Sequence, residues 1–168
     1  MITFEQYSPE GQALIEKART LAVEALKDMP RHDGMPFIGH PDAVARIVAY
    51  EIGLPAECVA AVYLHEASRM GGMEVLHKDW DENICTMVEG LNRISTIKPK
   101  DTRLEAENYK KLIIQYSTDP RVTVLKLADR LEVMRSLKIF PKASREGKIL
   151  ETLMLYIPLS HQLGLYNM

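Results

Sequence analysis

Three polar positions interrupt apolar segments of the sequence and could carry chemistry. His40 stands at the expected start of a helix, and the pair His65-Glu66 ends the most apolar segment of the chain. Asp129 follows Leu125 by four residues, so the two side chains share one helical face and the carboxylate is expected to point inward. A buried carboxylate without a partner costs several kcal/mol, so a hydrogen-bond donor, a cation or a metal ion should face Asp129.

Imidazole and carboxylate side chains together form a typical shell for a divalent transition metal. The two histidines with Glu66 and Asp129 would supply nitrogen and oxygen ligands from three separate elements. Such a set suits Mn²⁺, Fe²⁺ or Zn²⁺ and is too rich in nitrogen for Ca²⁺ or Mg²⁺. Taken singly, each residue also has a structural interpretation: a loop histidine bonding a helix end, a His-Glu pair closing a helix, an aspartate paired with a basic neighbour. Spacing alone leaves both interpretations open.

The elements that position these residues are expected to be helices. Apolar residues recur at helical spacing, and Ser8-Pro9 and Asp119-Pro120 are typical helix starts. The run VTVLKLA (122–128) could be taken for a strand, but its length and the pattern downstream favour a helix. A proline-rich loop is expected over 30–41. The predicted helices cover residues 8–29, 41–52, 56–68, 81–94, 101–116, 119–137 and 143–163, the last interrupted near Pro158.

The composition predicts one globular domain in a reducing compartment. The 168 residues are 46% hydrophobic and 26% charged with a formal net charge of -2, so no broad basic surface for nucleic acid is expected. The two cysteines, Cys58 and Cys85, form no metal-binding or disulfide pattern. No signal peptide or membrane span is recognisable, so we expect a cytoplasmic protein without membrane partners. The expected fold is all-α, with residues 1–168 as a single domain.

The order of the polar positions, H…HE…D on a helical chain, resembles the H…HD…D pattern of the HD phosphohydrolase superfamily. More closely, the sequence resembles the hydrolase domain of the Rel/SpoT family, which makes and degrades the stringent-response alarmone (p)ppGpp. The similar segments run in family order from about residue 8 to 166. They are GMPFIGHPDAVA (34–45), AAVYLHE (60–66), VEGLNRI (88–94), AEN (106–108), RVTVLKLADRL (121–131) and YIPLSHQLG (156–164).

The resemblance implies a helical bundle of the HD type, a Mn²⁺ ion and a pocket for a guanosine nucleotide whose 3′-diphosphate is hydrolysed. The implied metal ligands are His40, His65, Glu66 and Asp129, of which the two acids are also catalytic. Arg31 takes the position whose guanidinium stacks on guanine. The residues that could meet phosphates, with a solvated helix face as the alternative, are His32, Lys126, Arg130 and Arg135.

The sequence departs from the family pattern in its catalytic elements. Glu66 replaces the aspartate of the His-Asp pair, and Arg69-Met70 replace a Glu-Asp pair that positions and activates the attacking water. Glu132-Val133 replace a His-Asn pair, whose asparagine lies at the nucleotide wall. Loss of a general acid or base lowers a rate by about 10²–10⁴, so an impaired hydrolase is expected.

Three functions remain open on these grounds. The first is a regulatory, nucleotide-binding module, which in bifunctional family members is attached to an alarmone synthetase domain. The second is a working Mn²⁺-dependent (p)ppGpp 3′-pyrophosphohydrolase with slower turnover. The third is a stand-alone binder or hydrolase of another phosphorylated nucleotide. Because the chain stops where the family's hydrolase domain passes to a linker, we expect a piece of a longer bifunctional protein as one origin of this sequence.

Overall fold

The computed structural model describes residues 3–73, 76, 79–96, 109–111, 113–114 and 118–165, and in these residues the chain is helical without a β-strand. A lone bridge joins Pro30 and Pro36 in the loop before the second helix. The expected all-α class is therefore confirmed. The helices are α1 (Pro9–Leu26), α2 (Gly39–Arg46), α3 (Ala56–Gly71), α4 (Glu82–Thr96), α6 (Pro120–Arg135), α7 (Lys142–Glu151) and α8 (Ile157–Gln162), with π-helical segments at Ile47–Ile52 and Thr152–Tyr156 and a 3-10 turn at Leu137–Ile139.

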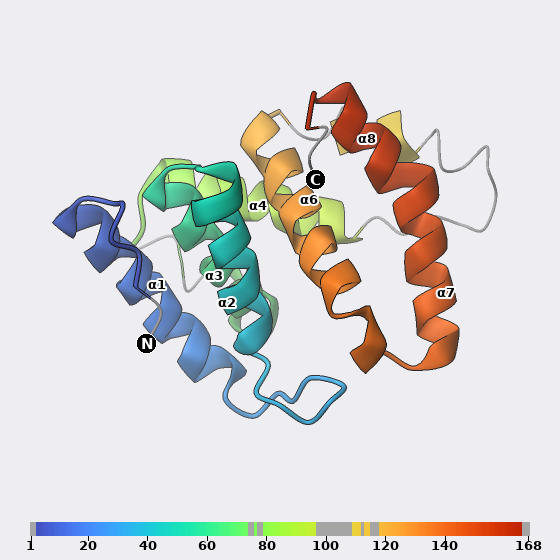
Figure 1. The fold of residues 1–168 in the computed structure, drawn as a ribbon. Coiled ribbons are helices and arrows are strands. Elements are labelled where there is room, and N and C mark those ends of the chain that lie inside the picture. Colours follow the sequence, from blue (N-terminus) through green and yellow to red (C-terminus); the bar gives the residue numbers. More distant parts are fainter. Residues whose placement is uncertain are drawn as a thin grey trace.

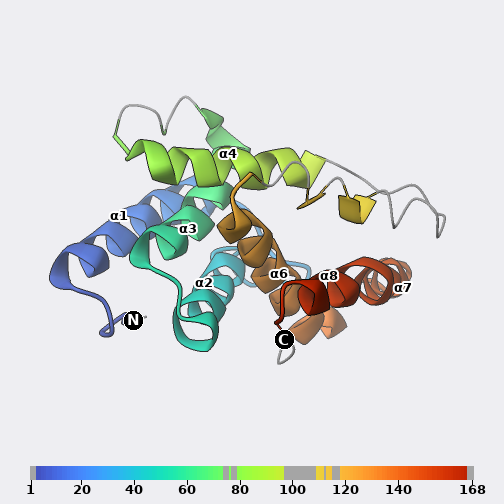
Figure 2. The same cartoon turned by 90° about the horizontal axis from the view of Figure 1, so that it is seen from above.

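Helix α3 is the centre of the core. Every residue from Cys58 to Ser68 is buried, as its apolar sequence predicts. It packs against α1, α2 and α4, and α6 in turn packs against α2 and α4. Figure 1 shows α6 in the middle of the molecule, with α1–α3 on one side and α7–α8 on the other, and Figure 2 shows α4 lying across the top of α3.

The predicted helix starts and stops are confirmed where capping residues mark them. The Ser8 Oγ accepts a hydrogen bond from the Gly11 amide at 3.1 Å, and the Asp119 carboxylate caps α6 through the Arg121 amide at 3.0 Å. The π-helical segment that continues α2 stops at Gly53, whose φ of 78° lies in the left-handed region that glycine adopts without strain. These short local signals fix the ends of the helices that carry the site.

The predicted interruption near Pro158 is a π-helical segment. Proline has no amide hydrogen and cannot donate to the carbonyl four residues before it, so the regular ladder fails there. The chain widens over Thr152–Tyr156 instead, and the Ile157 amide bonds the Thr152 carbonyl, five residues back. The helix then resumes and ends before Gly164, at φ 75°.

Two of the differences from the predicted helix ends bear on the site. Helix α2 begins at Gly39, two residues earlier than expected, so His40 lies inside its first turn and not before it. Helix α3 continues to Gly71, so Arg69 and Met70 lie on its last turn. Most of the predicted helix 101–116 lies outside the described residues. No described helix combines the length and apolar composition needed to cross a membrane.

Candidate metal centre

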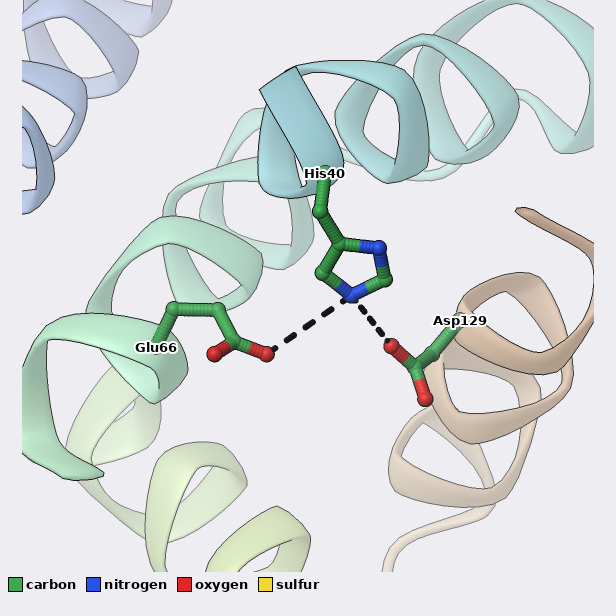
Figure 3. A group of neighbouring side chains, drawn as sticks. All are labelled: His40, Glu66 and Asp129. Carbon is green, nitrogen blue, oxygen red and sulfur yellow. Dashed lines mark hydrogen bonds and ion pairs between the residues drawn. The ribbon is translucent and has the colours of Figure 1, made fainter. Parts of the chain in front are cut away.

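Side chains from three helices converge between α2, α3 and α6. The His40 Nε2 lies 2.8 Å from the Asp129 Oδ1 and 3.8 Å from the Glu66 Oε1 (Figure 3). One ligand atom from each of the three residues lies within 4.8 Å of the others, which is the spacing of groups that could share a metal ion. The inward orientation predicted for Asp129 is thus what brings α6 into the site.

The cluster opens into a small pocket with an apolar wall. Its polar lining comes from His40, His65, Glu66, Lys126 and Asp129, and its apolar lining from Pro41, Val44, Val62, Leu91 and Leu125. The close approach of α4 to α6 beside it depends on Gly90, since a Cβ at this position would lie 2.9 Å from the Val122 Cγ2. Apolar residues therefore line the pocket beside the candidate ligand atoms.

His65 lies beside the cluster as a neutral imidazole. Its Nδ1 is 2.9 Å from the Asn92 Oδ1, and the Asn92 amide nitrogen donates to the Ser68 Oγ at 2.9 Å. Because the amide oxygen can only accept, Nδ1 carries the hydrogen and Nε2 keeps a free lone pair. Burial lowers the pKa of His65 to about 4. Its Nε2 lies 3.9 Å from the Glu66 Oε1, but His65 lies outside the group of three residues whose ligand atoms are all within 4.8 Å of one another.

His40 is held between two carboxylates. Its Nε2 contacts Asp129, and its Nδ1 lies 2.5 Å from the Glu132 Oε2. Burial opposes the charged form, but the hydrogen bonds to Asp129 and Glu132 outweigh it and raise the pKa of His40 to about 10. These two hydrogen bonds favour the imidazolium form of His40. A metal ion would take the place of the proton on Nε2, while Nδ1 would stay bonded to Glu132.

The two acidic members of the cluster differ in their electrostatics. Burial raises the pKa of Glu66, an effect that the charges of His40 and Arg69 only partly offset. For Asp129, burial is outweighed by Lys126 and His40, which lower its pKa. Asp129 is therefore an anion, and a cation bound beside Glu66 would stabilise the ionised form of that carboxylate as well. One imidazole and two carboxylates, with the His65 imidazole beside them, fit a divalent transition metal.

Of the basic residues predicted to contact a nucleotide, some lie near the cluster and others lie away from it. Lys126 lines the pocket, with Nζ 3.5 Å from the Asp129 Oδ2. Arg31 lies next to the cluster, bonded to Glu132. The other three lie outside the pocket lining: Arg130 bonds Glu151 and stacks over Tyr156, Arg135 pairs with Glu51, and the His32 ring lies 4.9 Å from that of Phe140.

The charge on His40 predicts how the stability of the metal-free protein depends on pH. Because the folded pKa is about 10 and the ordinary value is 6.5, the contribution of His40 is complete below about pH 6.5 and is lost as the pH rises toward 10. We expect the free energy of unfolding in excess chelator to fall by up to about 1.4 kcal/mol per pH unit over that window. Urea denaturation at several pH values measures it. His40→Gln should flatten the dependence and His32→Gln should not; an equally steep curve for His40→Gln would contradict the assignment.

Known proteins with a similar sequence or fold identify the family of this chain. A family model described as an HD domain matches residues 18–166. The chain belongs to the HD domain family. The resemblance to the Rel/SpoT hydrolase domain is confirmed by relatives across nearly the whole chain. A guanosine-3′,5′-bis(diphosphate) 3′-pyrophosphohydrolase of Aquifex aeolicus is 35% identical over 161 residues, which are 95% of this chain and 23% of that protein.

Two further relatives and one solved structure agree with this assignment. The bifunctional (p)ppGpp synthase/hydrolase SpoT of Escherichia coli is 33% identical over 97% of this chain and 24% of its own length. A GTP pyrophosphokinase of Streptomyces coelicolor is 35% identical over 90% of this chain and 18% of its own length. The chain thus spans about a fifth to a quarter of these relatives. A metazoan ortholog of SpoT, described as hydrolysing ppGpp, has the same fold, with a TM-score of 0.69 and 18% identity over 91% of this chain and 97% of that one.

Two residues of the site were not predicted from the sequence. Asn92 fixes the tautomer of His65, and Glu132 contacts His40. The sequence carried a usable signal for Glu132, since it lies three residues after Asp129 and so on the same face of α6. In the sequence it stands out only as a departure from the family pattern. Asn92 follows the apolar stripe of α4 by one residue and gave no such signal.

Proposed function

We propose that this HD domain binds a divalent metal, Mn²⁺ foremost, together with a guanosine nucleotide that carries a 3′-diphosphate, and that it hydrolyses this nucleotide slowly. Its role would then be regulatory or nucleotide-sensing, in the cytoplasm and beside a synthetase domain such as the bifunctional relatives contain. The observation that carries the proposal is the convergence of His40, Glu66 and Asp129 on one point while the last turn of α3 carries Arg69 and Met70 in place of acids.

The reaction expected of such a site is hydrolysis at phosphorus. Water would add to the 3′-diphosphate, the bond between the 3′ oxygen and phosphorus would break, and a guanosine 5′-diphosphate and pyrophosphate would leave. When bound, the metal would polarise the phosphate and lower the pKa of a water molecule. Of the chain's own residues, His40, His65, Glu66 and Asp129 would hold it, and Lys126 would face the negative charge of the phosphates.

Slow turnover is supported by the surroundings of Glu66. The Arg69 Nη1 lies 3.4 Å from the Glu66 Oε2, and the Arg69 side chain is 56% exposed. A guanidinium here attracts phosphate but cannot accept a proton from water. With no acid at positions 69 and 70, the factor of about 10²–10⁴ that general-base catalysis provides is missing.

The nucleotide-binding residues that we propose are Arg31 and Lys126, because both lie beside the cluster. Arg130 and Arg135 remain proposals of lower rank, since each lies away from the cluster, in an ion pair with Glu151 and Glu51 respectively. A phosphate would have to compete with these ion pairs.

A working hydrolase is the second candidate, and one observation favours it. Glu66 is longer than aspartate by one methylene, yet its Oε1 still lies 3.8 Å from the His40 Nε2, within reach of a shared metal. Glu66 therefore keeps its place beside His40, and for this candidate only the activation of water is in question.

Calorimetric titration with ppGpp and with GDP in the presence of Mn²⁺ tests the proposed nucleotide binding. We expect ppGpp to bind at least tenfold more tightly than GDP, because only ppGpp places a diphosphate at the metal and Lys126. Lys126→Met should reduce this difference, and Lys142→Met, at the exposed start of α7, should leave it unchanged. Equal affinity for the two nucleotides would contradict the proposal.

A further inference from the structure

Glu132 has two partners that come from the same stretch of chain about a hundred residues earlier. Its Oε2 lies 2.5 Å from the His40 Nδ1, and its Oε1 accepts a hydrogen bond from the Arg31 Nη2 at 2.7 Å. The Glu132 side chain is 6% exposed and that of Arg31 is 15% exposed, so the bridge is shielded from water. One carboxylate therefore joins the loop that carries Arg31 to the first turn of α2, which carries His40.

We propose that Glu132 is a positioning residue that fixes the ring of His40 and ties it to Arg31, so that metal binding depends on two residues that do not touch the metal. The inference rests on the proposed function, because it assigns a role to the ligand His40. Glu132 is also a position at which this chain departs from its family pattern by carrying an acid.

The effect on His40 follows from the hydrogen bond that its Nδ1 makes to Glu132. While Nδ1 donates its hydrogen to Glu132, the other nitrogen faces Asp129 and Glu66, and a rotation of the ring would break both contacts. A carboxylate behind a metal-bound imidazole fixes its orientation and raises its basicity, and its loss lowers metal affinity by about 10–100-fold. Glu132 would act on the metal in this way, through His40.

The effect on Arg31 follows from its packing. Its amide donates to the Met35 carbonyl at 2.7 Å, which closes the loop. Its Nη1 lies 3.6 Å from the point where a Cβ would stand on Gly39, so the guanidinium lies against the first turn of α2. The forked guanidinium reaches Glu132 from this position, and a lysine would keep the charge but lose the planar geometry.

Mn²⁺ titration by calorimetry, without nucleotide, tests the dependence of metal affinity. We expect Glu132→Gln to weaken Mn²⁺ binding by about 10–100-fold. Arg31→Lys should weaken it several-fold in the wild-type background and not further in Glu132→Gln, because both changes act through one carboxylate. Glu51→Gln, which removes an exposed carboxylate paired with Arg135, is the control for lost charge. Wild-type affinity in Glu132→Gln, or additive losses in the double variant, would overturn the inference.

A second measurement tests the bridge through Glu132 independently of the proposed metal binding. In the metal-free protein, the Nδ1 hydrogen of His40 should give a slowly exchanging, downfield NMR signal that Glu132→Gln removes, Arg31→Lys shifts and Glu51→Gln leaves in place. If wild-type protein fails to bind Mn²⁺ but shows this pattern, the proposed metal site is wrong and the bridge stands. If the same signal persists unchanged in Glu132→Gln, the proposed bridge is wrong whether or not Mn²⁺ binds.

Discussion

Replacing Asp129 by alanine is expected to abolish the rise in melting temperature that Mn²⁺ gives the wild-type protein. At a Mn²⁺ concentration 100 times Kd, binding stabilises the folded state by about 2.7 kcal/mol, which for a chain of this size is a rise of roughly 5–10 °C. Asp129 is the ligand that α6 contributes, and without it His40 and Glu66 remain as a weaker pair beside His65. Differential scanning fluorimetry with and without Mn²⁺ measures the shift.

Two further variants separate metal binding from folding in this experiment. Asp129→Asn keeps the size of the side chain and should lose the Mn²⁺ shift as completely as alanine does. Glu146→Ala, at an exposed position of α7, should keep it in full. A normal Mn²⁺ shift in a folded Asp129→Asn protein would show that the metal, if one binds, lies elsewhere.

Restoring the acids of the family pattern is expected to raise hydrolysis of ppGpp by about 10²–10⁴-fold, the contribution of a general base. The variant combines Arg69→Glu, Met70→Asp and Glu66→Asp. Arg69 and Met70 lie on the last turn of α3, and the Arg69 guanidinium already lies 3.4 Å from the Glu66 carboxylate, so acids at this turn would lie close to the metal ligands. Initial rates of pyrophosphate release measure the gain.

The control for this prediction is Arg69→Ala with Met70→Ala, which removes the guanidinium without supplying a base. It should bind Mn²⁺ more tightly, because a positive charge near the ligands is lost, and should gain little in rate. If the triple variant binds Mn²⁺ and ppGpp but shows no gain, the missing acids are not the defect, and Val133 or the loop after α3 would be the place to look.

Helix ends were predictable from the sequence where one residue decides them. Ser8, Gly53 and Pro158 each act through their own backbone chemistry, and the structure has a cap, a left-handed stop and a π-helical segment at these places. The start of α2 was misplaced by two residues because proline at 41 looks like a first-turn residue, and no side chain caps the helix before Gly39. The helical class could be predicted from the periodicity of apolar residues alone. The exact ends of the helices also depend on tertiary contacts.

The inward placement of the candidate ligands could be predicted from the sequence, but their hydrogen-bond partners could not. Asp129 could be oriented from its spacing to Leu125, and His65 and Glu66 stood out against an apolar helix. The partners of His40 could not be derived in the same way, because the bridge through Glu132 joins residues about a hundred positions apart. Spacing places Glu132 on the same face of α6 as Asp129, but which distant residues it meets depends on how α2 and α6 pack.

The rate of pyrophosphate release from ppGpp by the unmodified protein, with Mn²⁺ and at a nucleotide concentration that calorimetry shows to be saturating, decides between an impaired and a working hydrolase. We expect a complex that forms with Mn²⁺ present and turns over at least about 10²-fold more slowly than the variant with restored acids. Turnover by the unmodified protein as fast as that variant would contradict it, because water would then be activated without an acid at positions 69 and 70.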